Sequence, residues 1–565
     1  MAKKDYSNLT KDQLLEVIEK LEGKKKYGLV WDEERVPEKV VTDCQDKLPV
    51  LTEVKGKEIN TDENEPTHIL IEGDNYHALS VLNYTHKGKI DLIYIDPPYN
   101  TGNNDFKYND KFVDKNDTWR HSKWLTFMSK RLELAKELLT EKGIIFISID
   151  DNEQAQLKLL CNAIFGEENF ITNIIWESKT GASDAKTIDT ITEYILVYVK
   201  SPGKTNYSRN KFSYEVKRYR FTDEYEEIRG PHYTDNLDRG GLRYSDSLNF
   251  PIVCPDGTTT YPNGRTEFVN DGWTWKWGET KVKWGLENGY IAFKKSTSKP
   301  SGWAVLYKNY MYADNEGNPI ERSAPQKNVI NDVKTGDGAS LIKQIFEHQV
   351  FKYSKPIQIV DRVMDYVELK DDAIILDFFA GSGTTGHSVL KFNFEFNSKR
   401  QFIICTNNEG KICDEITYPR ISKAIKGYKT SKGKQIEGLG NNLKYFKTSF
   451  VANNRNKDQL KIDITKRCTE MLCLKEGIFN LIKEEADYKI FQQSNHYLAV
   501  YYDFANASLD ELKEEMNALK GEKVLYCFTV DNHGLDKANF RGWKNIRLEP
   551  IPQKILDVYK RIFKN

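Results

Sequence analysis

The sequence has no long apolar run, no excess charge of either sign and few cysteines. No stretch of its 565 residues approaches the roughly 20 apolar residues needed to span a bilayer, and the first residues lack the apolar segment of a signal peptide. Lysine and arginine total 83, as do aspartate and glutamate, so any nucleic-acid contact must come from local patches. The eight scattered cysteines fit a reducing cytoplasm rather than a disulfide framework. Membrane, secreted and fibrous classes are thereby excluded.

Several common catalytic motifs are also missing from the sequence. It has no Walker pattern and no helicase-like motif, so we expect the chain itself neither to hydrolyse ATP nor to translocate. The pairs Cys405/Cys413 and Cys468/Cys473 have no companions at zinc-ligand spacing, so we expect them to be structural and expect no metal.

Apolar strands alternate with helical patterns over the first part of the chain. Such alternation predicts an α/β domain with a parallel sheet that is covered by helices on both faces. The pattern predicts strands at residues 68–74, 89–96, 144–150 and 193–200, and helices at 124–139 and 154–165.

The helical period disappears between residues 201 and 350, where Gly, Pro, Asn, Asp and aromatic residues dominate. Strand–helix alternation resumes at residues 373–379 and 400–409, so an insertion divides the α/β domain. Thr10 and Gln13 form a capping-box pattern at the start of an N-terminal helix. The predicted parts are an N-terminal helical segment (1–60), the two halves of the α/β domain (61–200 and 351–440), the insertion (201–350) and a small C-terminal α/β domain (441–565).

The tetrapeptide Asp96-Pro97-Pro98-Tyr99 follows a buried strand. Ligands in open α/β sheets bind beyond the carboxyl ends of the strands, and the two prolines stiffen the backbone and remove two N–H donors. The site therefore offers a carboxylate, a carbonyl and an aromatic face, which suit a flat ring with an exocyclic amine. The amine would donate to Asp96 and to the carbonyl of Pro97, while Tyr99 stacks on the ring. The alternative is a strand that merely ends in a Pro-Pro turn.

A glycine-rich turn follows a second strand, in the segment that begins Asp377-Phe378-Phe379. Gly381 and Gly383 permit a tight turn and a close approach of ligand to backbone. The letters GSGTTG match a dinucleotide fingerprint, but that match is weak. The carboxylate of Asp377 would repel a pyrophosphate and attract an ammonium group, so a cationic cofactor with an amino-acid tail, S-adenosylmethionine, fits better. A purely structural strand–turn–helix remains the alternative.

The two elements together resemble the β-class amino-methyltransferases, which act on N6 of adenine or N4 of cytosine in DNA. In that class the DPPY element precedes the glycine loop, and a target-recognition insertion lies between them. The likeness extends to the modification subunits of type III restriction–modification systems, through DLIYIDPPYNTGN, KGIIFISIDDNE, EYILVYVK, LDFFAGSGTTGH and TNNEG…TYPRI. It covers about residues 25–450 and implies a Rossmann-like S-adenosylmethionine-dependent methyltransferase sheet. The aspartate of DPPY favours adenine, because cytosine members usually carry serine there.

The resemblance assigns roles to residues of the DPPY element. Asp96, Pro97 and Tyr99 would hold a flipped adenine, and Pro98 would stiffen the turn. Asp150 and Asp151 either line the target pocket or cap the following helix.

On the cofactor side, the resemblance places Asp377, Phe379, Gly381 and Gly383 along the methionine end. Lys355-Pro356 matches the family's cofactor-side KP element. Further cofactor contacts are expected from Asp74, toward the cofactor's adenine, and from Glu409, toward the ribose hydroxyls, although Asn407 or Asn408 could take the place of Glu409.

The sequence therefore predicts a DNA adenine-N6 methyltransferase, most like a type III modification subunit. The expected partners are double-stranded DNA, a second copy of the chain and a restriction subunit with helicase and nuclease functions. Alternatives are a solitary or type II methyltransferase, a non-catalytic DNA-binding subunit, and an enzyme that methylates RNA or a protein amide. Within the insertion, the tryptophans between residues 273 and 303 either form a local core or contact DNA.

Overall fold

The computed structural model describes residues 10–11, 13–15, 31, 37–181, 188–210, 218–241, 243–351, 353–430, 433–453, 456–502, 509–531, 535 and 540–563. The chain divides into two compact units. The second unit is the continuous segment Ser208–Gln326, and the chain on either side of it forms the first.

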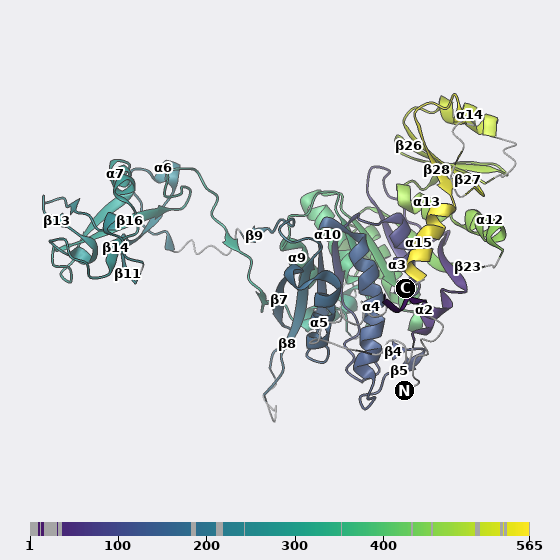
Figure 1. Ribbon diagram of the computed structural model, residues 1–565, viewed down its shortest axis with the longest axis horizontal. Coiled ribbons are helices and arrows are strands. Elements are labelled where there is room, and N and C mark those ends of the chain that lie inside the picture. Colours follow the sequence, from purple (N-terminus) through teal and green to yellow (C-terminus); the bar gives the residue numbers. More distant parts are fainter. Residues whose placement is uncertain are drawn as a thin grey trace. The chain divides into compact units, whose positions relative to one another are not determined.

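A ten-stranded sheet is the centre of the first unit (Figure 1). Its order is β1-β23-β2-β20-β19-β3-β6-β8-β7-β18. The neighbours from β23 to β6 run parallel to one another. In chain order the strands are β1 (Lys47–Glu53), β2 (Thr67–Glu72), β3 (Ile90–Ile95), β6 (Leu139–Ile149), β7 (Phe170–Glu177), β8 (Thr192–Val199), β18 (Val329–Ile330), β19 (Ile374–Asp377), β20 (Gln401–Thr406) and β23 (Asn442–Ala452).

The predicted parallel sheet is in fact mixed, because strands toward both of its ends run antiparallel to a neighbour. β8 runs antiparallel to β6 and β7, and β1 runs antiparallel to β23. Parallel neighbours need a long crossover, usually a helix, whereas β8 follows β7 with no helix among the described residues between them. The predicted helical segment 1–60 is also corrected, because β1 belongs to the sheet. Near its start, the backbone N–H of Thr10 donates to Gln13 Oε1 over 2.9 Å, as the capping pattern predicts, and most of residues 11–36 lies outside the described residues.

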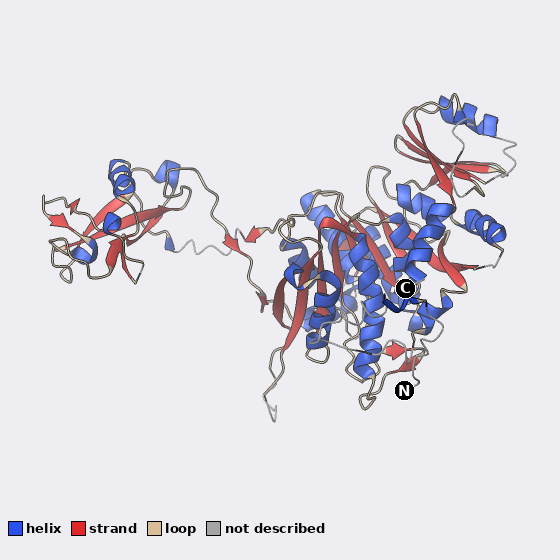
Figure 2. Cartoon of the chain, in the orientation of Figure 1, coloured by secondary structure: helices blue, strands red, loops and turns tan. Residues whose placement is uncertain are grey.

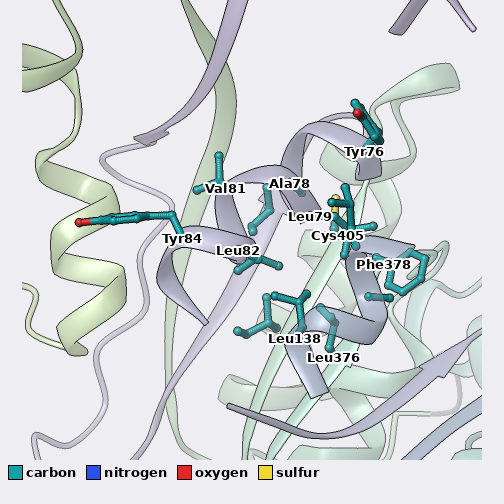
Figure 3. Close-up of a cluster of buried hydrophobic side chains, with 14 of the residues drawn as sticks. Tyr76, Ala78, Leu79, Val81, Leu82, Tyr84, Leu138, Leu376, Phe378 and Cys405 are labelled. Atoms are coloured by element: carbon teal, nitrogen blue, oxygen red, sulfur yellow. The ribbon is translucent and has the colours of Figure 1, made fainter. Parts of the chain in front are cut away.

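Helices cover both faces of the sheet, as predicted (Figure 2). Alternate residues of the central strands enter opposite cores: Ile93 and Ile95 of β3 belong to one, and Leu92 and Tyr94 to the other. Figure 3 shows part of the first core, where α3 packs against Leu138, Leu376 and Cys405. This core contains α3 (Asn75–Thr85), α4 (Arg120–Leu138) and α5 (Gln154–Phe165), and the second contains α9 (Ile357–Asp365), α10 (Thr384–Phe396) and α11 (Tyr418–Lys426).

A five-stranded sheet lies near the C-terminal end of the chain and belongs to the first unit. Tyr526 and Ile555 from this region share the core of α3. The large sheet includes β23, so residues 442–452 belong to it and not to the C-terminal domain predicted to begin at 441. Its elements are β24 (Asn480–Glu484), β25 (Tyr488–Gln493), β26 (His496–Tyr501), β27 (Glu522–Phe528) and β28 (Ile546–Ile551), with α12 (Lys457–Arg467), α13 (Thr469–Glu476), α14 (Leu509–Ala518) and α15 (Gln553–Phe563).

The regular elements of the second unit are mostly short strands, and the unit is shorter than the predicted insertion 201–350, because β18 and α8 (Thr335–Phe346) belong to the first unit. Trp275 and Trp277 are buried in its core, which favours the local-core interpretation of the tryptophans. Its three-stranded sheet comprises β10 (His232–Asn236), β15 (Ile291–Lys295) and β16 (Trp303–Tyr310), and its other elements include β9 (Arg209–Asn210), β11 (Asp238–Gly240), β12 (Ile252–Val253), β13 (Thr259–Thr260), β14 (Trp273–Trp275), β17 (Ala324–Pro325), α6 (Glu226–Arg229) and α7 (Glu279–Glu287).

None of the described helices is long and apolar enough to cross a membrane.

Candidate active site

Two acidic residues lie at the carboxyl edge of the large sheet, at the ends of neighbouring strands. Asp377 ends β19, and Asp96 directly follows β3, which is the neighbouring parallel strand. The register pairs Leu376 with Ile93, so both carboxylates lie at the same edge although the second unit separates their strands in the chain. This edge is where open α/β sheets bind their ligands.

The DPPY element is held rigidly next to Asp96. The indole N–H of Trp124 in α4 donates to the carbonyl of Pro98 over 2.7 Å. Among the described residues, no donor reaches the carbonyl of Pro97. Asp96 Oδ1 is likewise a buried acceptor without an aligned hydrogen bond. The element therefore presents two acceptors without an aligned hydrogen bond on a stiff backbone, namely the Pro97 carbonyl and a carboxylate oxygen that forms an ion pair with Lys355.

The side chain of Lys355 is expected on the cofactor side, but its ammonium group lies next to the DPPY element. Its Nζ is 2.7 Å from the hydroxyl of Tyr99, 2.8 Å from Glu193 Oε2 and 3.3 Å from Asp96 Oδ1. The ammonium group also lies 5.3 Å from the centre of the Trp176 ring. The backbone of Lys355 still faces the glycine loop, because its carbonyl is 3.3 Å from Thr384 Oγ1. The KP element thus joins the two halves of the site.

The charges in this cluster shift one another's pKa values. Burial raises the pKa of Asp96, and Lys355 only partly opposes that shift, to which Glu193 adds. Burial alone would lower the pKa of Lys355, but Asp96 and Glu193 together raise it. The pKa of Glu193 is lowered, because Lys355 and the Tyr99 hydroxyl outweigh the effect of burial. Lys355 and Glu193 are therefore charged at neutral pH, and of the two carboxylates beside Lys355, Asp96 is the one whose charge is less compensated.

The glycine loop encloses the second carboxylate. Asp377 is 3% exposed, and its oxygens accept hydrogen bonds from the Phe379 N–H over 2.9 Å and from Thr385 Oγ1 over 2.6 Å. Burial raises its pKa to about 7, and no lysine or arginine in the described part of the chain contributes to lowering it. A carboxylate buried in this way attracts a cation.

The loop conformation requires glycine at two positions. Gly381 has φ 49° and Gly383 has φ 82°, and a Cβ on Gly383 would lie 3.2 Å from Thr417 Cγ2. Phe379 is partly buried, with its ring centre 5.8 Å from that of Phe127. Pro356 immediately precedes α9 and is buried.

The remaining predicted residues lie in the loops around this edge. Asp74 begins α3, where it accepts a hydrogen bond from the Tyr76 N–H over 2.7 Å and lies 3.3 Å from Arg131 Nη2. Glu409 forms an exposed ion pair with Lys107. Their roles toward a cofactor stay predictions.

Asp150 lies at the turn before α5. It accepts from the Asn152 N–H over 2.9 Å and from the Asn152 side chain, and its carbonyl accepts from Gln154 N. These contacts stabilise the turn, and Glu153 is the residue that directly precedes the helix.

Sequence reasoning missed Glu193 and Trp124, and it expected Lys355 on the cofactor side only. An acid at the start of an otherwise apolar strand, as in EYILVYVK, is the one signal that could have singled out Glu193. The pairing of Lys355 with Asp96 and Glu193 depends on the strand order, which no local pattern predicts.

A known protein family matches this chain over the residues that form the site. The sequence profile of the DNA methylase family matches residues 90–418, which include both halves of the site. Among curated relatives, the Mod subunit of the type III restriction-modification enzyme StyLTI from Salmonella typhimurium is 33% identical over 378 residues, 61% of this chain and 53% of that protein. The EcoP15I Mod subunit from Escherichia coli is 29% identical over 69% of this chain and 66% of that protein. The type II methyltransferase M.KpnI from Klebsiella pneumoniae is 30% identical over 67% of this chain and 90% of that protein.

Proposed function

Because the chain belongs to the N6/N4 DNA methylase family, we propose that it transfers a methyl group from S-adenosylmethionine to N6 of an adenine that is flipped out of duplex DNA. The matched region spans about half to two thirds of the two type III relatives, so activity, substrate and partners are proposed for this chain. The observation that carries the proposal is the adjacency of Asp96 and Asp377 at the ends of neighbouring parallel strands.

The residues at the glycine loop fit the cofactor. Asp377 is a buried carboxylate with no cationic partner among the described residues, and an amino-acid ammonium group would supply one. The positive φ of Gly381 and Gly383 lets the loop backbone approach the ligand. Asp377, Phe379 and the two glycines would hold the methionine end, with Lys355 and Pro356 closing the loop from the other side. When bound, the cofactor supplies an electrophilic methyl group on a sulfonium.

The DPPY element fits the amine of the target base. An exocyclic amine has two N–H donors, and the element has two acceptors without an aligned hydrogen bond, Asp96 Oδ1 and the Pro97 carbonyl. Two accepted hydrogen bonds localise the nitrogen lone pair and direct it toward the electrophile. The half-buried ring of Tyr99 offers a stacking surface, and Lys355 and Glu193 hold its hydroxyl in place. Positioning and exclusion of water then do most of the catalytic work.

Adenine is proposed over cytosine because Asp96 occupies the first position of the tetrapeptide, where cytosine-N4 enzymes of this class usually carry serine. Single-molecule sequencing of DNA from cells that express the chain tests the target base and reads the recognition motif. Methylated adenine at one recurrent sequence is the expected result. Methylated cytosine would contradict the adenine assignment, and unmodified DNA from cells with folded protein would contradict the proposed activity.

A type III setting is proposed for the enzyme, with a second copy of the chain and a restriction subunit as partners, in a cytoplasmic location. The Mod subunits support this setting. A type II enzyme without such a partner is the second candidate, because M.KpnI is matched over 90% of its own length. Purification from the source cells distinguishes the two: a stoichiometric chain with ATPase and nuclease motifs supports type III, and methylated DNA in cells without such a chain supports type II.

The second unit is proposed to hold the duplex and read its sequence. A flipped base requires a surface that binds the rest of the duplex, and the second unit is a compact body whose sequence lies between the two segments that form the site.

A further inference from the structure

Arg420 is a completely buried arginine directly below the glycine loop. It lies in the first turn of α11 and is 0% exposed. Its Nη1 is 2.9 Å from Ser382 Oγ, 3.0 Å from Thr384 Oγ1 and 3.2 Å from Ser354 Oγ. Ser382 and Thr384 belong to the loop and to the start of α10, and Ser354 directly precedes the KP element.

The positive charge of Arg420 has no negative partner in the described part of the chain. All its acceptors are neutral oxygens, and its Nε and Nη2 atoms are buried without a hydrogen bond. Burial lowers its pKa to about 9. A buried cation with unused donors is costly unless an anion joins it.

Arg131, the other fully buried arginine in the part of the chain that the structure describes, shows how a structural guanidinium is satisfied here. Arg131 is also 0% exposed, and Glu38 binds it with both oxygens, at 2.8 and 2.9 Å. Asp74 lies 3.3 Å from the same group. Among the described residues, no carboxylate binds Arg420 as Glu38 binds Arg131. Its Nε and Nη2 groups are therefore available to an acceptor from outside the chain.

Arg420 and Asp377 are linked through consecutive threonines. Thr384 Oγ1 is 3.0 Å from Arg420 Nη1, and Thr385 Oγ1 is 2.6 Å from Asp377 Oδ2. Two buried groups of opposite charge, Arg420 of α11 and Asp377 of β19, therefore lie next to the loop. Neither has a charged partner among the described residues. An α-amino acid carries its ammonium and carboxylate on one carbon, so it complements such a pair.

We propose that Arg420 binds the α-carboxylate of the cofactor's methionine moiety, while Asp377 binds the ammonium group of the same moiety. The free Nε and Nη2 groups would donate to the carboxylate, and the hydroxyls of Ser354, Ser382 and Thr384 keep the guanidinium in place. This assignment rests on the proposed function. The competing role for Arg420 is purely structural, as a clip that holds the glycine loop to α11.

A ligand series on the full-length protein tests the carboxylate site by calorimetry, without turnover. The ligands are S-adenosylhomocysteine, its decarboxylated analogue and its deaminated analogue. Charge-assisted hydrogen bonds give roughly 10- to 150-fold in affinity, so each analogue should bind the wild type at least about tenfold more weakly. If no adenosyl ligand binds, the proposed function fails. If S-adenosylhomocysteine binds and the decarboxylated analogue matches it, only the carboxylate site fails.

Variants then assign the carboxylate to Arg420. In Arg420→Met the preference for the carboxylate should vanish, while the preference for the ammonium stays within a few-fold of wild type. Asp377→Asn, the matched control, should show the reverse pattern. Arg420→Lys should retain part of the carboxylate preference, because it keeps the charge but loses the planar fork. Equal losses for all three ligands in Arg420→Met would instead indicate the structural clip.

A crystal structure with S-adenosylhomocysteine decides the point even if the variants fail to fold. A carboxylate oxygen within hydrogen-bond distance of Arg420 Nε or Nη2 is expected. A carboxylate that lies elsewhere, with those two donors still unpaired, would overturn the assignment.

Discussion

The hydroxyl of Tyr99 donates a hydrogen bond to Glu193, with 3.0 Å between the phenolic oxygen and Oε2. Tyr99 belongs to the DPPY turn after β3, and Glu193 lies near the start of β8, so the contact joins two strands that are separated in the sheet by β6. Lys355 donates to both oxygens. These contacts orient the aromatic ring, and Lys355 Nζ also lies over it, 4.8 Å from the ring centre.

Tyr99→Phe should therefore retain most methylation activity, and Tyr99→Ala should lose roughly 1–3 kcal/mol of base stacking. Phenylalanine keeps the ring, and Lys355 and Glu193 still pair with each other at 2.8 Å. A duplex with 2-aminopurine at the target position reports base flipping. Its fluorescence should rise when wild type binds and rise further with Tyr99→Ala, where no ring remains to quench it. A Phe variant as inactive as the Ala variant would show that the hydroxyl has a chemical role.

Asp96→Ala should abolish methylation and leave cofactor affinity within a few-fold of wild type. Asp96 Oδ1, which has no aligned hydrogen bond, is proposed to act on the target amine, whereas the cofactor's tail is proposed to bind at Asp377. Calorimetry with S-adenosylhomocysteine measures the affinity, and a methyl-transfer assay measures activity. Loss of cofactor binding in this variant would mean that the two roles are not separable.

Glu193→Gln should reduce kcat/KM for methylation by about tenfold or more, without weakening cofactor binding. Glutamine keeps the size and an acceptor for Tyr99 but removes the charge that holds Lys355, whose ammonium should then pair more closely with Asp96. That pairing would occupy the acceptor proposed for the base. An unchanged kcat/KM, measured beside wild type at the same pH, would show that Glu193 does not position Lys355.

Cofactor affinity should rise with pH through about 7. Burial raises the pKa of Asp377 from 3.8 to about 7, and only its ionised form attracts an ammonium group. Below pH 7 the affinity should fall by up to about tenfold per pH unit, and above it the affinity should level off. Calorimetry at pH 6, 7 and 8 tests this, with Asp377→Asn as a control whose binding is weak and less dependent on pH.

The raised pKa of Asp377 also affects the stability of the unliganded protein. Stability should change with pH in the direction opposite to cofactor affinity. The native state binds the proton of Asp377 more tightly than the unfolded state does, so the free energy of unfolding should fall as pH rises from about 4 to about 7. Asp377→Asn should remove this part of the pH dependence in urea unfolding. An identical pH profile for wild type and variant would contradict the raised pKa.

Replacing the second unit by a short Gly-Ser linker should leave cofactor binding intact and abolish site-specific methylation. The two ends of the unit run side by side, because Arg209 pairs with Pro325 and Asn210 with Ala324. A short linker can therefore close the gap. Calorimetry measures cofactor binding, and sequencing of incubated DNA reads methylation. Methylation at the wild-type motif by the shortened chain would show that the second unit does not read the sequence.

The sequence by itself determined the local elements of the site. One strand ends in Asp-Pro-Pro-Tyr, and another ends in Asp before two glycines. Both turns can be predicted from the sequence, because proline restricts and glycine widens the range of backbone angles at its own position. The interruption between the two elements was also visible, because the helical period vanishes there. The alternating cores follow from the two-residue period of the strands.

Only the tertiary structure decided which charged side chains lie close to one another. Lys355 reaches Asp96 and Glu193 because β3, β6 and β8 are successive strands of one sheet, and the antiparallel direction of β8 brings its first residues to the carboxyl edge. Arg420 lies below the glycine loop because α11 packs beside α10. Such contacts depend on strand order and helix packing between segments far apart in the chain. A local sequence pattern carries no information about them, since charged residues have the same appearance in sequence whether they face solvent or one another.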